Sequence, residues 1–164
     1  MQSQYDILKC LSYMENLLSV PPIKANYEKS LYRWYDKVGQ TIMSCVKVCE
    51  KENRIKIKDF IGLLHKKTQK IQKLTPSVIE KNILLLGEIF HLNKNEIDLI
   101  GLMFRHKQYA FLSNFVEYFL GYHWEHLDSY AVLLKLTYSQ MMNMLREDGR
   151  LMQTDIFSYD VMTE

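Results

Sequence analysis

Two histidines and an aspartate form the pattern in the chain that is nearest to a metal site. His123 and His126 are three residues apart and Asp128 follows them, and on a helix that spacing could offer two imidazoles and a carboxylate to a metal ion. The alternative is a helix end near Trp124 with ordinary surface or interface histidines. We favour the alternative and expect no metal here.

The three cysteines offer less chemistry. Cys45 and Cys49 are four residues apart and would share a helix face, but no further metal ligand lies near them in the sequence. Together with Cys10 they make an odd number at spacings that give no disulfide framework. We expect buried thiols, because free cysteine is among the residue types most often buried.

Familiar catalytic and nucleotide-binding motifs are absent from the sequence. It has no glycine-rich phosphate loop, no Gly-x-Ser-x-Gly turn and no His-Glu-x-x-His pair. Its six glycines are scattered through segments with helical periodicity, where they cannot form a cradle for phosphates. The sequence therefore predicts a chain that is not an enzyme and uses no cofactor.

Lysines dominate the middle of the chain. Residues 46–73 hold nine basic and three acidic residues, whereas residues 117–164 hold three basic and eight acidic ones. Because the basic stretch has a single aromatic residue, it gives no support for base stacking. A solvated lysine face or docking to an acidic protein surface fits it better. The candidate interaction surface comprises six lysines: Lys56, Lys58, Lys66, Lys67, Lys70 and Lys73.

Residues 128–159 have the outline of a helix-turn-helix followed by an extended segment. The second helix would present five polar side chains to a DNA groove: Tyr138, Ser139, Gln140, Asn143 and Arg146. The acidic balance of this region opposes DNA binding, which draws on several lysine and arginine contacts to phosphates. We predict the winged-helix-like shape and keep nucleic-acid binding as the alternative function.

The helices that would position these residues are visible as apolar periodicity. Apolar residues recur at three- and four-residue steps over 4–19, 27–49 and 58–74, and Pro21-Pro22 ends the first of these segments. Proline and glycine are scarce, which favours helices over a β-sandwich. We expect an all-α fold, a multi-helix bundle with a small winged-helix-like C-terminal unit.

Capping signals place the helices of the second half. Thr75-Pro76-Ser77 should open a helix to about residue 90, with Thr75 as the cap. Because residues 83–86 are all apolar, we expect this helix in the centre of the core. Residues 93–96 and 137–140 have capping-box spacing.

Two further boundaries follow from single residues. Ser113 is expected to cap a helix through Leu120, which Gly121 would close. Weak alternation over residues 151–159 predicts one strand or a small hairpin.

The length of 164 residues corresponds to about one domain. We divide it into an N-terminal helical subdomain with a basic face, residues 1–74, and a helical core with a helix-turn-helix-like unit and extended tail, residues 75–164. No apolar run is long enough to span a bilayer, and residues 1–13 lack the pattern of a signal peptide. We expect a cytoplasmic protein without a membrane partner.

Two stretches resemble the region upstream of the ATPase module in some bacterial AAA-type ATPases. Residues 85–100, Leu-Leu-Gly-Glu-Ile-Phe-His-Leu-Asn-Lys-Asn-Glu-Ile-Asp-Leu-Ile, are similar to a leucine-rich helix that ends in a Leu-Gly-Leu-Ser turn and is followed by a Glu-x-x-Leu-Leu helix. Residues 134–145, with Asp148-Gly149-Arg150-Leu151 and Ile156, are similar to the small helical unit that comes next in the same proteins. The resemblance covers about residues 83–160.

The resemblance implies a non-catalytic adaptor or regulatory domain that works by protein–protein contact, as the N-terminal part of such an ATPase. Its partner would be another protein or the ATPase module of the same protein. No Walker A lysine follows the two stretches, so no nucleotide-binding residue carries over. A helix-turn-helix nucleic-acid-binding protein is the alternative.

Overall fold

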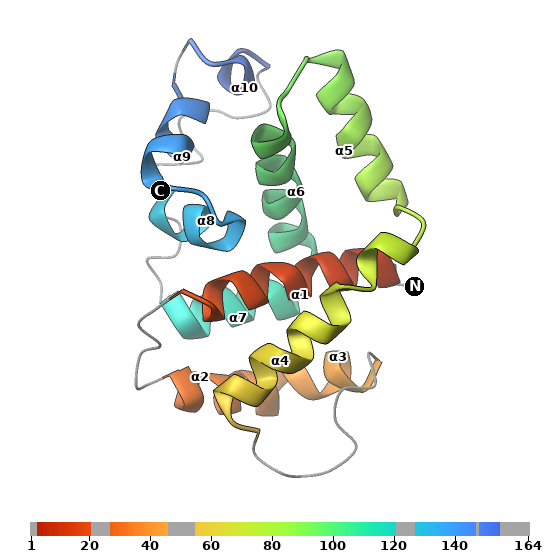
Figure 1. Cartoon of the computed structure of the whole chain (residues 1–164), viewed down its shortest axis with the longest axis vertical. Coiled ribbons are helices and arrows are strands. Elements are labelled where there is room, and N and C mark those ends of the chain that lie inside the picture. The colour runs from red at the N-terminus through yellow and green to blue at the C-terminus, as the bar shows by residue number, and fades with distance from the viewer. Residues whose placement is uncertain (1–2, 21–26, 46–54, 121–126, 147, 155–164) are drawn as a thin grey trace.

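The computed structural model describes residues 3–20, 27–45, 55–120, 127–146 and 148–154. Every regular element in these ranges is a helix, which confirms the all-α class. Figure 1 shows α1 crossing the middle of the molecule, with α2, α3 and α4 on one side of it and α5, α6, α8, α9 and α10 on the other.

The first two predicted helices of the N-terminal half are confirmed wherever the structure describes them, whereas the helix predicted over residues 58–74 ends at Thr68 and is followed by a separate 3₁₀ turn. A π-helical turn, η1, joins α2 to α3 without a break, so residues 27–45 form one helical run, and 46–49 lie outside the described residues. The elements are α1 (Gln4–Leu18), α2 (Tyr27–Trp34), η1 (Tyr35–Gly39), α3 (Gln40–Cys45), α4 (Ile57–Thr68) and the 3₁₀ turn η2 (Ile71–Lys73).

Trp34 anchors this half at the π-helical turn. Its indole is fully buried, its Nε1 donates a hydrogen bond to the Phe111 carbonyl at 2.9 Å, and its ring meets Phe115 edge-on at 5.2 Å between centroids. The ring lies so close to Gly39 that a Cβ there would be 2.7 Å from it. Glycine at this position therefore lets the backbone approach the indole.

The C-terminal half contains six helices among the described residues: α5 (Val78–Ile89), α6 (Lys94–Gln108), α7 (Ala110–Leu120), α8 (Leu127–Leu134), α9 (Tyr138–Met144) and α10 (Arg150–Gln153). Both predicted capping boxes are confirmed. Asn93 Oδ1 accepts from the Glu96 amide while Glu96 accepts from the Asn93 amide, and Thr137 and Gln140 do the same. These reciprocal bonds satisfy amides that a helix start leaves open.

Two predicted helix starts are wrong by a few residues. The cap of α5 is Ser77, whose hydroxyl accepts from the Glu80 amide at 3.1 Å, so Thr75 and Pro76 precede the helix. Ser113 lies inside α7, which begins at Ala110 after an extended Tyr109, and its hydroxyl donates to the Ala110 carbonyl. A serine can bond to a backbone carbonyl within a helix as well as cap one.

The strand predicted after Gly149 is wrong for the part that is described, because residues 150–153 form the short helix α10. Residues 155–164, and Gly121 with its expected role in closing α7, lie outside the described residues. With no strand among its described residues, the C-terminal unit does not confirm the winged-helix-like shape.

Two clusters of buried side chains hold the helices together. The larger one is formed mainly by α1, α2, α4 and α7, and the smaller one by α5, α6, α8, α9 and α10. α1 links them, since it packs against α4 and α7 and also against α6 and α8. α7 lies beyond the predicted boundary at residue 74 yet packs on α1 and α2.

Candidate functional site

α5 lies at the edge of the molecule and packs mainly on α6, so the expectation that it occupies the centre of the core is wrong (Figure 1). Its buried residues are Glu80, Ile83 and Gly87, which share one side of the helix. A Cβ at Gly87 would lie 2.5 Å from Ile97 Cδ1. Because glycine has no side chain, α6 can approach α5 closely at this point. A narrow strip of buried residues therefore holds α5 against α6.

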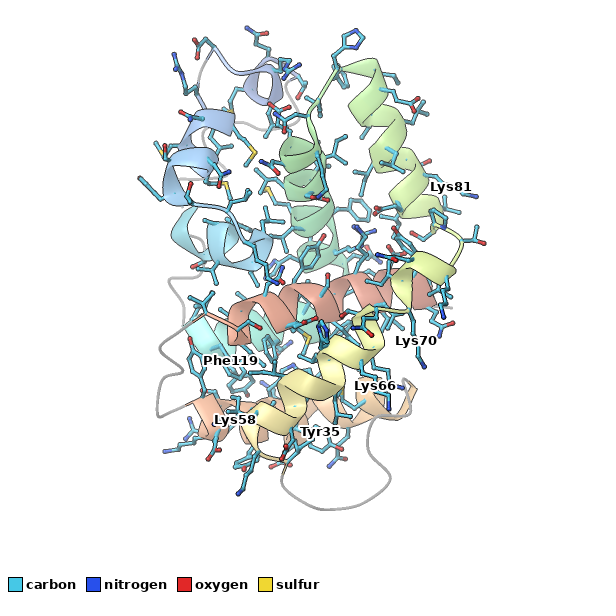
Figure 2. All side chains as sticks on the ribbon, in the orientation of Figure 1. Tyr35, Lys58, Lys66, Lys70, Lys81 and Phe119 are labelled. Carbon is cyan, nitrogen blue, oxygen red and sulfur yellow. The ribbon has the colours of Figure 1, made fainter. Side chains whose placement is uncertain are left out.

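The opposite side of α5 is apolar and exposed. Val78, Leu85 and Ile89 are 73%, 53% and 59% exposed, and their spacing of seven and four residues places them on one stripe. Figure 2 shows Lys81, next to this stripe, pointing away from the body of the molecule. We call the exposed residues of this side the α5 face: Val78, Lys81, Asn82, Leu85, Glu88 and Ile89.

Three further exposed apolar side chains lie on the α5–α6 hairpin. Leu84, Phe90 and Phe104 are 42%, 37% and 48% exposed. With the three apolar residues of the α5 face, they make up six of the nine large hydrophobic side chains that are exposed in the described ranges. Scattered exposed apolar residues need no explanation, but such a concentration on one hairpin is typical of an interaction surface.

A buried ion network fixes the base of the α5–α6 hairpin against α1. Arg105, on α6, donates from Nε and Nη2 to Asp6 Oδ1 at 3.0 and 2.7 Å, and from Nη2 to Glu80 Oε2 at 2.6 Å. All three residues are buried. Burying charges is costly unless they are paired with good geometry, so the network defines how α1, α5 and α6 meet.

Glu80 is the member of the network that belongs to α5. Its Oε1 accepts a hydrogen bond from the Tyr5 hydroxyl at 3.1 Å and lies 3.2 Å from Lys9 Nζ. Burial opposes ionisation, but Lys9 and Arg105 outweigh it and hold the pKa of Glu80 below its ordinary value. Burial and the Glu80 carboxylate raise the pKa of Tyr5 to about 12. The first turn of α5 is therefore held to α1 by charge and hydrogen bonds.

A pocket of about 680 Å³ opens where α1 and α5 begin and α6 ends. Its lining includes Val78 and Lys81 of the α5 face, so pocket and face are continuous. Asp6 also lines it, and its Oδ2 is buried without a hydrogen-bond partner among the described residues. Burial, together with the nearby Asp6 carboxylate, raises the pKa of Tyr109, another lining residue, to about 12.

The six predicted lysines lie along α4 and the turn η2, with Lys56 just before α4. Five are exposed and Lys67 is half-buried, and Figure 2 labels Lys58, Lys66 and Lys70 along the length of α4 and just beyond its end. The salt bridges among the described residues involve none of the five exposed lysines. The structure therefore brings them together as a solvated basic face.

The structure keeps the predicted DNA-reading residues apart from these lysines. Figure 1 shows α9 and α4 on opposite sides of α1. Tyr138, Ser139, Gln140, Asn143 and Arg146 are exposed on or next to α9, and the Arg146 Nε lies 3.0 Å from the Asp148 carboxylate. A duplex on α9 would therefore meet one arginine, already paired, rather than the basic face.

The structure describes only some of the remaining candidate metal-binding residues. His123, His126 and Cys49 lie outside the described residues, as do the side chains of Asp128 and Cys45. Cys10 is buried in α1, and burial raises the pKa of its thiol. In the described parts of the chain, no three His, Cys, Asp or Glu side chains gather in a way that could hold a metal.

Neither the ion network nor the exposed α5 face was predicted from the sequence. A signal for the network exists, since Asp6, Glu80 and Arg105 each occupy a position on a helix side with mostly apolar neighbours, and charged residues are seldom fully buried unless paired. The α5 face carried the opposite signal, because an all-round apolar helix is ordinarily interpreted as core.

Comparison with protein-family models, with curated proteins and with solved structures found no significant match to this chain. The site must therefore be interpreted from its own chemistry. Among the described helices, none has the length and apolar character needed to cross a membrane.

Proposed function

We propose that the chain is a non-catalytic adaptor or regulatory domain that binds a protein partner through the α5 face. The observation that carries this proposal is the exposure of Val78, Leu85 and Ile89 in one stripe on a helix that is rigidly seated on its other side. Covering such a stripe removes apolar surface from water, at about 25 cal/mol per Å². Because the ion network holds the first turn of α5, little order is lost on binding.

Photo-crosslinking from the α5 face tests this proposal. Benzoylphenylalanine replaces Leu85 in the protein expressed in its cells of origin, and the matched control carries the same group in place of Lys29, exposed on α2. We expect a discrete crosslinked species from position 85 that is reduced by Ile89→Glu. Equal or weaker crosslinking from position 85 than from position 29 would reject the proposal.

We extend the proposal to the family that the sequence resembles, as the N-terminal part of an AAA-type ATPase. The first resembling stretch folds as the end of α5, a turn in which His91 has φ 54°, and the start of α6, so the hairpin that bears the α5 face is also the one that carries the resemblance. Reading the gene past the codon for Glu164 tests this extension. If no Walker A motif is found in the same reading frame or in a neighbouring gene, the extension to the ATPase family is rejected. The interaction proposal would still stand.

A further inference from the structure

We infer that the partner of the α5 face is a second copy of this chain, paired through two antiparallel α5 helices. This inference rests on the proposed function and names its partner. The face is exposed along all of α5, and Figure 1 shows α5 at the outer edge of the molecule. A second α5 can therefore lie along the first without obstruction from the helices that α5 packs against.

The spacing of the exposed residues is that of a helix-pairing seam. Val78, Asn82, Leu85 and Ile89 are separated by four, three and four residues, which is the alternation of the two core positions in a heptad repeat. In an antiparallel pair, Val78 of one copy would meet Ile89 of the other, and Leu85 would meet Asn82. One polar residue in such a seam is a known device for fixing register at a cost in stability.

The charges beside the seam select the antiparallel direction. Lys81 and Glu88 are exposed, are seven residues apart and occupy the same flanking heptad position. In an antiparallel pair this position faces itself, so Lys81 of each copy would lie next to Glu88 of the other. In a parallel pair, by contrast, Lys81 and Glu88 of one helix would lie next to the apolar residues Ile79 and Leu86 of the other helix. The pattern is thus complementary to itself under a twofold axis, as an isologous dimer requires.

The ion network favours this use of α5. Glu80, the acid of α5 that could disturb the charge pattern, points to the other side of the helix and is paired with Arg105 and Lys9. In the described residues, Lys81 and Glu88 take part in none of the salt bridges. Both charges are therefore available to a second copy.

Sedimentation equilibrium of charge variants tests the pairing. We expect the native chain to show a monomer–dimer equilibrium, and Lys81→Glu and Glu88→Lys each to weaken dimerisation about tenfold, because two attractive pairs per dimer become repulsive. An equimolar mixture of the two variants should form a heterodimer, detectable by native mass spectrometry, and the double variant Lys81→Glu/Glu88→Lys should dimerise like the native chain. Lys29→Glu, at an exposed position on α2, is the matched charge control and should change nothing.

Three results would overturn the inference: a native chain that is monomeric at every concentration, a mixture no more associated than either variant alone, or equal weakening by Lys29→Glu. Circular dichroism shows for each variant that the fold is retained. A monomeric native chain whose position 85 still crosslinks to a different protein would reject the second copy and keep the proposed function. A chain that neither dimerises nor crosslinks would reject both.

Discussion

The guanidinium of Arg105 on α6 lies 2.7 Å from the Asp6 carboxylate on α1, and neither side chain is more than 1% exposed. The two residues are 99 positions apart, so the pair joins the first helix to the sixth. Tyr13, on α1, is also buried, and its burial raises the pKa of its hydroxyl. The contact between α1 and α6 is therefore defined by polar groups inside the core as well as by apolar packing.

Arg105→Met should destabilise the fold strongly. The substitution preserves most of the side-chain volume but leaves the Asp6 and Glu80 carboxylates buried without their main partner, which costs about 3–5 kcal/mol. The matched control is Arg146→Met, which removes an exposed pair with Asp148 and should change the free energy of unfolding by less than about 0.5 kcal/mol. Urea unfolding measures both, and similar losses in the two variants would contradict the role given to Arg105.

Acidification should weaken the fold through His106. Burial lowers its pKa from 6.5 to about 4, so between these values the unfolded chain binds a proton that the folded chain does not. The stabilising contribution is therefore complete above about pH 6.5 and is lost as pH falls toward 4, by an amount on the order of 3 kcal/mol. Glu80, whose pKa is also held down, adds a loss in the same direction below about pH 4.5.

Urea unfolding of the native chain and of His106→Gln, at intervals from pH 7 to pH 4.5, measures this effect. The native chain should lose stability as pH falls, and the variant should show a flatter profile over the same range. Parallel profiles would mean that the loss comes from other groups.

The parts of the fold that were predictable are those set by local chemistry. Asn93 with Glu96 marks a helix start because the two residues satisfy each other's amides wherever that turn forms. Ser113 shows the limit of such signals, since the same hydroxyl can bond to a carbonyl inside a helix. The role of Ser113 depends on where α7 begins. Because the backbone of Tyr109 is extended, α7 begins at Ala110 and Ser113 falls inside the helix.

The candidate site was harder to predict because it depends on which side of each helix meets another. Leu84 and Leu85 differ little from Ile83 in chemistry, yet Ile83 is 4% exposed and Leu85 is 53% exposed. Gly87 decides this, because the side that lacks a side chain is the one on which α6 can pack closely. The pairing of Arg105 with Asp6 likewise requires α1 and α6 to be neighbours, which no local pattern specifies.

Two glycine substitutions should change stability in opposite directions. Gly62→Ala on α4 introduces a methyl group with no atom within 4 Å and should stabilise the fold by about 0.5–1 kcal/mol, the difference in helix propensity. Gly87→Ala places its methyl group 2.5 Å from Ile97 Cδ1 and 2.8 Å from Cγ1. Overpacking of this kind costs about 1–3 kcal/mol, so the net effect should be a loss.

A double-mutant cycle identifies the cause of that loss. In an Ile97→Ala background the obstructing atoms are gone, so Gly87→Ala should become neutral or stabilising. Urea unfolding of the four chains gives the coupling. If Gly87→Ala costs the same with and without the Ile97 side chain, the close approach of α5 and α6 is not what requires glycine.

The edge position of α5 predicts very different effects for two apolar residues that are two positions apart. Ile83→Ala removes buried side-chain atoms between α5 and α6 and should cost about 2–4 kcal/mol. Leu85→Ala alters a side chain that is more than half exposed and should change the free energy of unfolding by about 0.5 kcal/mol or less. The measurement belongs at a concentration where the native chain is monomeric, because association would add to apparent stability. A loss at Leu85 as large as that at Ile83 would place α5 inside the core and remove the surface on which both proposals stand.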